Sequence, residues 1–126
     1  MERKKFWAKI DRTFAKLSTQ NGKCQVWVGA KDRHGYGRKM LTWPNAQSAE
    51  ISVHRLAYMR FKNLLPHQMP RFDQNGHTLD VSHLCHNTLC IRPDHLTLEK
   101  RENNLDRKAC AAVALVIMFH YVYFDC

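Results

Sequence analysis

Residues 81–96 read Val81-Ser82-His83-Leu84-Cys85-His86-Asn87-Thr88-Leu89-Cys90-Ile91-Arg92-Pro93-Asp94-His95-Leu96, and this segment decides the fold. Its cysteines and histidines are crowded together. Four residues separate Cys85 from Cys90 and four separate Cys90 from His95, a loop spacing at which soft ligands can converge on zinc. Pro93 restricts the backbone of this loop. The pattern therefore predicts a zinc site at Cys85, Cys90 and His95.

A tetrahedral zinc site needs a fourth ligand. Cys24 is the candidate, because it lies on a predicted strand that pairing can bring to the loop, whereas the remaining cysteines lie beyond the downstream helix. Three thiolates and one imidazole close the coordination sphere, so this zinc is expected to be structural. His83 is then surplus to the site, and a neutral imidazole can accept a proton from water near neutral pH.

The charge of the chain favours a polyanionic partner. There are 20 Lys and Arg residues against 11 Asp and Glu, which gives a formal charge of +9 and a pI of about 9.6. Nucleic acid is the first candidate partner and an anionic membrane the second, although a basic but inert surface has the same composition. At 126 residues the chain fits one domain, whose small core a bound metal would supplement.

The cysteines also bear on location. Their number, five, is odd, so a disulfide framework cannot account for all of them, and metal thiolates in a reducing compartment fit better. The charged start, Met1 to Lys5, is followed by an amphipathic segment rather than an apolar one, unlike a secretory signal. We therefore expect a nuclear or cytoplasmic location.

The N-terminal third predicts a helix and a basic hairpin. Apolar residues recur at helical spacing within residues 1–17, and the turn-prone Gln20-Asn21-Gly22 is expected to end this helix. Residues 24–28 alternate as a strand and are expected to pair with residues 36–41 across a turn at 32–35. The basic side chains of this hairpin suit a β-ribbon lying along DNA, although a solvated face would look the same; they are Lys31, Arg33, His34, Arg38 and Lys39.

The remaining elements surround the ligand loop. A loop at 43–46 precedes a second helix, expected to start near Ser48 or Glu50, and residues 65–76 are irregular. Residues 78–84 predict a short strand entering the loop, and residues 96–108 a charged helix leaving it. The apolar residues 111–124 would span only about 21 Å as a helix, too short for a bilayer core of about 30 Å, so no membrane partner is expected. A buried strand, a buried helix, a dimer-forming arm and an atypical chain end that contributes little remain alternatives for this tail.

One longer motif combines these features: Ser82-His83-Leu84-Cys85-His86-Asn87-Thr88-x-Cys90-x-x-Pro93-x-His95-Leu96, with Asn104 downstream. It resembles the His-Cys box of the His-Me finger (ββα-metal) homing endonucleases and, more widely, the HNH nuclease motif. The close resemblance covers residues 81–110, with weaker agreement at Cys24-x-x-Trp27-x-Gly29 and Val53-His54-Arg55. It implies an α+β fold with a ββα-metal nuclease core, a zinc-stapled loop, a basic antiparallel hairpin and flanking helices. Residues 1–110 would form this domain and residues 111–126 an apolar tail.

The resemblance also implies roles for individual residues. His83 would be the general base that activates water against a DNA phosphodiester, and Asn104 would bind a single Mg²⁺ ion. Asn104 is preferred to Asn103 because its distance from His95 matches the family pattern. Zinc would be bound by Cys24, Cys85, Cys90 and His95. An arginine that contacts the scissile phosphate is also expected, with Arg38 the first choice and Lys39 and Arg55 behind it.

The chain departs from the family pattern after the asparagine helix. Cys110 stands where a second zinc site would begin, but His120 and Cys126 do not follow the expected spacing. The second zinc and the C-terminal arm exchange of a homodimer are therefore open. The leading hypothesis is a Mg²⁺-dependent endonuclease acting on double-stranded DNA. The alternative is a zinc-stabilised DNA-binding module without catalysis, derived from such a nuclease.

Overall fold

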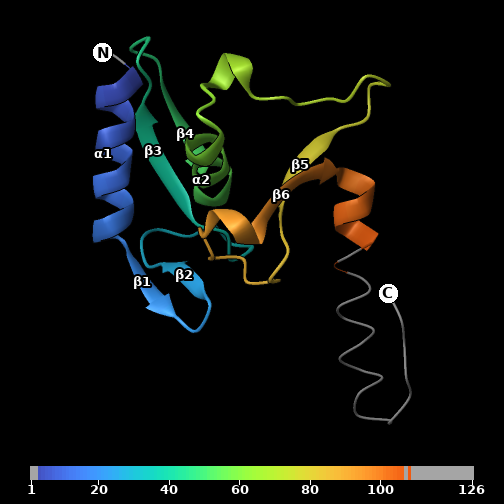
Figure 1. The fold of residues 1–126 in the computed structure, drawn as a ribbon, viewed down its shortest axis with the longest axis horizontal. Helices are drawn as coiled ribbons and strands as arrows, with labels where there is room; N and C mark the ends of the chain where they lie inside the picture. Colours follow the sequence, from blue (N-terminus) through green and yellow to red (C-terminus); the bar gives the residue numbers. More distant parts are fainter. Residues whose placement is uncertain (1–2, 107, 109–126) are drawn as a thin grey trace. The chain divides into compact units, whose positions relative to one another are not determined.

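A computed structural model describes residues 3–106 and 108 of the chain (Figure 1). Cys110, His120, Cys126 and the apolar tail, on which the sequence carries predictions, lie outside these residues. The chain divides into two compact units, one of Met1–Met69 with His83–Thr97 and one of Pro70–Ser82 with the chain from Leu98 onward. Short helices alternate with small antiparallel hairpins, so the α+β prediction is confirmed.

The elements follow one another in the order α1 (Arg3–Lys16), β1 (Ser18–Asn21), β2 (Cys24–Trp27), β3 (Arg38–Thr42), β4 (Ser48–Ser52), α2 (Val53–Lys62), η1 (Pro66–Gln68), β5 (Leu79–His83), η2 (Pro93–His95) and β6 (Leu96–Lys100). Residues 101–106 are helical. No helix among residues 3–106 and 108 combines the length and apolarity that crossing a bilayer requires.

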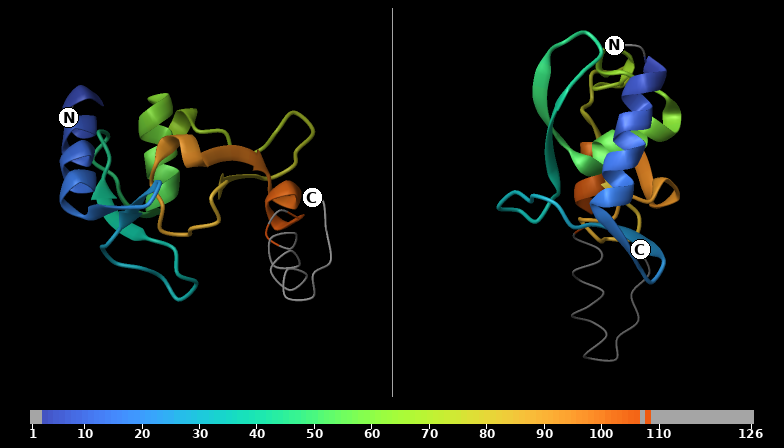
Figure 2. Two further views of the ribbon diagram at one scale, coloured as in Figure 1. Left: turned by 60° about the horizontal axis from the view of Figure 1, so that its bottom comes forward. Right: turned by 90° about the vertical axis from the view of Figure 1, so that its left-hand side faces the viewer.

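Helix α1 buries the apolar stripe that its periodicity predicts. Phe6 and Trp7 are at most 3% exposed, and the Phe6 ring packs on Trp43 in the β3–β4 loop, with ring centroids 5.3 Å apart. Arg60 of α2 donates two hydrogen bonds, of 2.8 and 3.0 Å, to the carboxylate of Asp11 in α1. Helix α1, the β3–β4 hairpin and α2 therefore form one packed group, which both views of Figure 2 show.

The first hairpin differs from the prediction. Gln20-Asn21-Gly22 does not end the helix, which stops at Lys16; it belongs to strand β1 and its turn. Strand β2 pairs with β1, in the register Ser18↔Trp27 to Asn21↔Cys24, and not with residues 36–41. The reason is the two-residue loop after Asn21, where Gly22 takes a φ of +60°. Glycine at the first position of a two-residue loop favours such a tight hairpin turn, which pairs β2 with the strand directly before it.

The second hairpin includes residues for which the sequence predicts a helix. Strand β3 pairs with β4 from Arg38↔Ser52 to Thr42↔Ser48, so the predicted helix start near Ser48 or Glu50 is wrong. Ser52 takes an extended backbone as the N-cap of α2 without a side-chain hydrogen bond to the helix, which begins at Val53. The basic hairpin thus exists around Arg38 and Lys39, with a different partner strand.

Close approach of the backbone to Trp27 fixes the centre of the first unit. Trp27 is 1% exposed, and its indole N–H donates to the carbonyl of Ala30 at 2.9 Å. Gly37 lies against the same ring, where a Cβ would stand only 2.6 Å from Trp27 Cδ1 and 2.4 Å from Val53 Cγ2. The absence of a side chain at Gly37 therefore allows the segment leading into β3 to pack on the start of α2.

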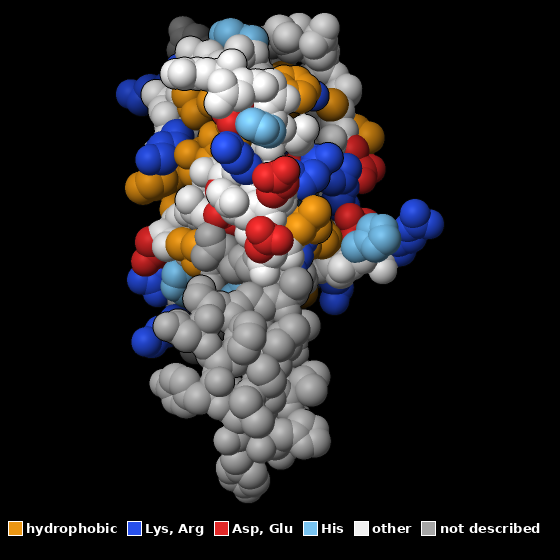
Figure 3. All heavy atoms as spheres, turned by 90° about the vertical axis from the view of Figure 1, so that its right-hand side faces the viewer, with side chains coloured by type: hydrophobic (Ala, Val, Ile, Leu, Met, Phe, Trp, Pro, Cys, Tyr) orange, Lys and Arg blue, Asp and Glu red, His pale blue; other side chains and the backbone are white. Residues whose placement is uncertain are grey.

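The second unit contains a turn and an ion-paired helix start. The Asp73 carboxylate accepts hydrogen bonds from the backbone N–H groups of Asn75 and His77, each 2.9 Å long, and closes the turn. Arg101, at the start of the helical residues 101–106, donates to both carboxylate oxygens of Asp80 at 3.0 and 3.1 Å. The face in Figure 3 accordingly shows Asp and Glu side chains interspersed with Lys and Arg.

The predicted helix over residues 96–108 is wrong in its first part. Leu96–Lys100 forms strand β6, which pairs with β5, and the helix begins only at residue 101. Leu96 and Leu98 alternate with polar neighbours, a pattern that suits a strand as well as a helix over so short a run. Pairing with β5 satisfies the backbone groups of both strands, and this non-local contact decides between the two.

Candidate metal centre

Backbone pairing brings the ligand loop to strand β2. The N–H of Trp27 donates to the carbonyl of Leu89 and the N–H of Ile91 donates to the carbonyl of Gln25, each at 2.8 Å. Between these bonds, Val26 and Cys90 form an antiparallel bridge. Cys90 therefore lies next to β2, whose first residue is Cys24. This is the strand pairing that the sequence analysis expected to carry Cys24 to the loop.

The two ends of the loop are tied together as well. The N–H of Leu84 donates to the carbonyl of His95 at 2.8 Å, and His95 ends the short helix η2, which Pro93 begins. At its middle, the side chain of Asn87 accepts from the N–H of Leu89 at 3.0 Å, a local turn that asparagine favours. The loop is thus folded by hydrogen bonds of its own backbone in addition to any ion.

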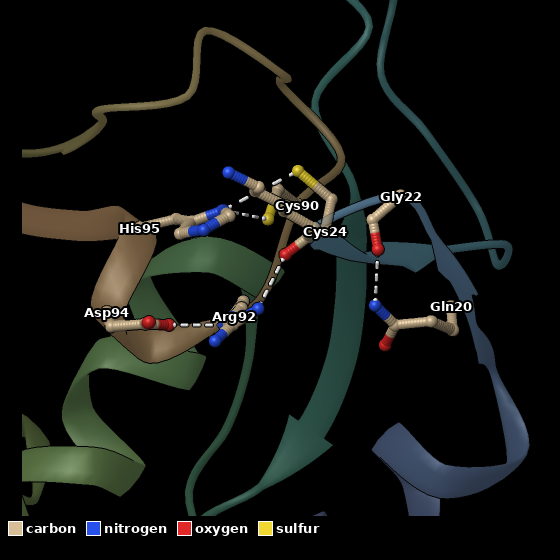
Figure 4. Close-up of polar contacts among 8 residues, drawn as sticks. Gln20, Gly22, Cys24, Cys90, Arg92, Asp94 and His95 are labelled. Carbon is tan, nitrogen blue, oxygen red and sulfur yellow. Dashed lines mark hydrogen bonds and ion pairs between the residues drawn. The ribbon is translucent and has the colours of Figure 1, made fainter.

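The structure brings together the four residues proposed as zinc ligands. One ligand atom each from Cys24, Cys85, Cys90 and His95 lies within 4.8 Å of the other three. The Nδ1 atom of His95 is 3.4 Å from the Cys90 sulfur and 3.6 Å from the Cys24 sulfur (Figure 4). Zinc bound to sulfur at 2.3 Å and to nitrogen at 2.0 Å places tetrahedral ligand atoms about 3.5–4 Å apart, so this donor set fits zinc.

The surroundings of the cluster favour a closed, structural site. Cys90 is fully buried, and the cysteines of the described residues are free thiols. Burial, together with hydrogen bonding to Cys90 and Cys85, raises the pKa of Cys24 to about 12. Without a metal this thiol therefore stays protonated at neutral pH, and zinc binding must displace its proton. Arg92 supports the site from outside by donating to the carbonyl of Lys23 at 2.9 Å.

His83 lies beside the cluster of Cys24, Cys85, Cys90 and His95 and is not a member of it. It is 8% exposed at the end of β5, and its Nε2 atom is 3.1 Å from the carbonyl oxygen of Cys90. A carbonyl oxygen can only accept, so Nε2 carries the proton and, in the neutral ring, Nδ1 carries the lone pair. A fixed tautomer of this kind is what a general base needs.

The other predicted site residues come from other elements of the chain. Arg38, the first residue of β3, forms an ion pair with Glu50 of β4, with Nε and Oε1 2.8 Å apart. Lys39 follows it on β3, and Arg55 lies in the first turn of α2. Asn104 belongs to the second unit, where it is 8% exposed, whereas Asn103 is exposed. In that unit the pKa of Asp80 is lowered, chiefly by its hydrogen bonds from Arg101 and also by one from Asn104.

The structure also shows residues that the sequence reasoning left out. The ring of His54 lies against His83, with centroids 4.5 Å apart, and Tyr36 lies 6.1 Å from His83. The hydroxyl of Thr88, within the ligand loop, donates to the carbonyl of Gly35 at 2.9 Å. The sequence signal for His54 is the weak agreement of Val53-His54-Arg55 with the family motif.

A family model independently matches residues 9–123 of the chain, and its description is the zinc-binding loop region of homing endonuclease. The match includes all four residues of the cysteine and histidine cluster as well as His83 and Asn104. With a match over most of its length and a ligand cluster of the required composition, the chain belongs to the homing endonuclease zinc-binding loop family.

Proposed function

We propose that the chain is a Mg²⁺-dependent endonuclease that hydrolyses double-stranded DNA with His83 as general base. The observation that carries the proposal is the hydrogen bond from His83 Nε2 to the Cys90 carbonyl, 3.1 Å long. It assigns the lone pair of the neutral ring to Nδ1. An imidazole in this tautomer can take a proton from the attacking water at neutral pH, a contribution worth about 10²–10⁴-fold in rate.

The metal requirement of the proposal rests on Asn104. An amide oxygen is a ligand that Mg²⁺ accepts, and an incomplete protein ligand set is usual for this ion because it retains several waters. Mg²⁺ supplies positive charge to the phosphate and to the leaving oxygen when it is bound. In the second unit, the contact of Asn104 with the Asp80 carboxylate engages the amide N–H group and leaves the amide oxygen as the metal-binding atom.

Arg38 is the proposed phosphate contact. Its ion pair with Glu50 joins side chains that are 33% and 51% exposed, and a pair this exposed contributes only about 0–1 kcal/mol. Arg38 can therefore exchange the carboxylate for a DNA phosphate at little cost, with a bidentate geometry that lysine lacks. Lys39, the next residue of β3, points to the opposite side of the strand.

The test is cleavage of supercoiled plasmid by zinc-loaded protein, in Mg²⁺ or in EDTA. Wild type should nick or linearise the plasmid only with Mg²⁺, and His83→Ala should lose at least about 10²-fold in rate while keeping zinc and DNA affinity. His67→Ala, at an exposed histidine in η1, is the control and should cleave normally. Binding without Mg²⁺-dependent cleavage by the wild type would instead favour the non-catalytic DNA-binding module.

A further inference from the structure

The aromatic rings of two residues from separate segments lie at His83 and form a group of three rings with it. His54 comes from the first turn of α2, and Tyr36 from the turn before β3. The centroid of the His54 ring is 4.5 Å from that of His83, with the ring planes at 42°. Tyr36 is 6.1 Å from His83 at 29° and 5.5 Å from His54. These separations fall in the range at which aromatic pairs attract one another.

The hydrogen bond to Cys90 alone does not fix the imidazole of His83. It holds one edge atom, Nε2, about which the ring plane can still turn. A second ring, tilted by 42° with its centroid 4.5 Å away, restricts that rotation. We propose that His54 is a positioning residue that holds the imidazole plane of His83 by ring contact, an inference that rests on His83 being the general base.

His54 is itself well placed for this role. Its neighbour Val53 is fully buried, and the Val53 N–H donates to the carbonyl of Gly37 at 3.0 Å. The first turn of α2 is thereby fixed to the segment that carries Tyr36. His54 is only partly buried, so a ring of similar shape can replace it.

The ligand loop also fixes the segment that carries Tyr36, the third ring of the group. Thr88 donates from its hydroxyl to the carbonyl of Gly35, directly before Tyr36. The same loop contains Cys90, whose carbonyl accepts from His83. The loop that carries the zinc ligands therefore orients His83 twice, through a hydrogen bond at its edge and through Tyr36 at its ring.

The test compares His54→Ala with His54→Phe in the zinc-loaded protein. His54→Ala removes the ring, and we expect kcat for cleavage of a DNA duplex to fall by about 10–10²-fold, the size of effect expected when a catalytic group is misplaced by about 1 Å. KM and zinc content should not change. His54→Phe keeps the ring contact without the nitrogens, so it should restore most of kcat. Equal losses of kcat in both variants would show that the nitrogens matter, and would overturn the proposal.

A second readout is independent of turnover. The ring ¹⁵N resonances of histidine-labelled protein, recorded without Mg²⁺, report on His83 directly, with its signals identified by their absence from His83→Ala. His54→Ala should shift and broaden these signals, and His54→Phe should leave them close to wild type. Unmoved signals together with an unchanged kcat would refute the proposal. If His54→Ala fails to fold, His54→Leu, which fills the space without a flat ring, takes its place in the comparison with His54→Phe.

His83→Ala separates the failure of this proposal from that of the proposed function. Normal cleavage by His83→Ala would remove His83 as the general base, and the positioning role would fall with it. Loss of cleavage in His83→Ala combined with full activity in His54→Ala would overturn the positioning role alone.

Discussion

Gly37→Ala tests the packing of the segment that carries Tyr36 and Arg38 against Trp27 and the start of α2. The new Cβ would stand 2.4 Å from Val53 Cγ2 and 2.6 Å from Trp27 Cδ1, whereas ordinary contacts begin at 3.4 Å. Neither neighbour can yield easily, since Val53 is fully buried, Trp27 is 1% exposed, and a β-branched side chain in a helix has a single favoured rotamer. The backbone of residues 36–38 must therefore move by about 1 Å.

Two effects on stability oppose each other in this variant. Overpacking of a buried site costs about 1–3 kcal/mol, and replacing glycine reduces the entropy of the unfolded chain, which stabilises by about 0.4–1 kcal/mol. The clash is larger, so a net loss of about 1–2 kcal/mol is expected, or a fall in Tm of roughly 4–10 °C. Because the displaced backbone carries Tyr36 and Arg38, kcat per folded molecule should fall as well.

Gly76→Ala is the matched control. Gly76 has a φ of +81°, and a Cβ there would have no neighbour within 4 Å. Alanine in this left-handed conformation costs about 1–2 kcal/mol, so its thermal midpoint should fall about as far as that of Gly37→Ala. Its kcat should not change. The assay is thermal unfolding beside single-turnover cleavage, and an unchanged midpoint for Gly37→Ala would show that the described packing is wrong.

Three further perturbations address the metals. Cys90→Ser removes one proposed ligand from a fully buried position. We expect the variant to lose stoichiometric zinc, measured by metal analysis, and about 4 kcal/mol of stability or more, measured by denaturant unfolding. Retained zinc with normal stability would exclude the site. Because the pKa of Cys24 is raised to about 12, the zinc-free folded protein holds a proton that the unfolded chain releases near pH 9. The stability of the zinc-free protein should therefore fall as the pH rises from about 9 toward 12. The zinc-loaded protein, whose thiolate has no proton to lose, should not show this fall when unfolding is measured against pH. Asn104→Ala should abolish Mg²⁺-dependent cleavage with zinc content intact, and the exposed Asn103→Ala should cleave normally; the reverse order in a plasmid assay would exchange their roles.

Local spacing in the sequence was enough to predict the ligand cluster. Elements whose structure depends on long-range strand pairing were predicted wrongly. Cys85, Cys90 and His95 are close in sequence, so a short loop suffices to gather them. The partner of Cys24–Trp27 could not be chosen in this way, because alternation identifies a strand and says nothing about which strand it meets. The helix prediction for residues 96–100 was wrong for the same reason, since only pairing with β5 distinguishes this strand from a helix.

The position of His54 was beyond local reasoning altogether. It lies 29 residues before His83 in the chain, and its periodicity marks only a helix. What brings its ring to His83 is the packing of Val53 on Gly37 and of Gly37 on Trp27, contacts among three separate segments. Such contacts have no signature in any one stretch of sequence, although the similarity of Val53-His54-Arg55 to the family marked the segment as more than core.

The geometry of Cys90 explains why a structural metal centre lies next to the proposed base. Its sulfur belongs to the cluster and its carbonyl accepts from His83, so one residue connects the two sites. A closed set of four protein ligands leaves no position for water, and zinc held there could influence cleavage only through the loop. Its contribution would then be positional: a loop fixed at Cys90 holds the edge of the imidazole, and a loop fixed at Thr88 holds the Tyr36 turn. Removal of zinc should therefore release the orientation of His83 even at temperatures where α1 and α2 remain folded.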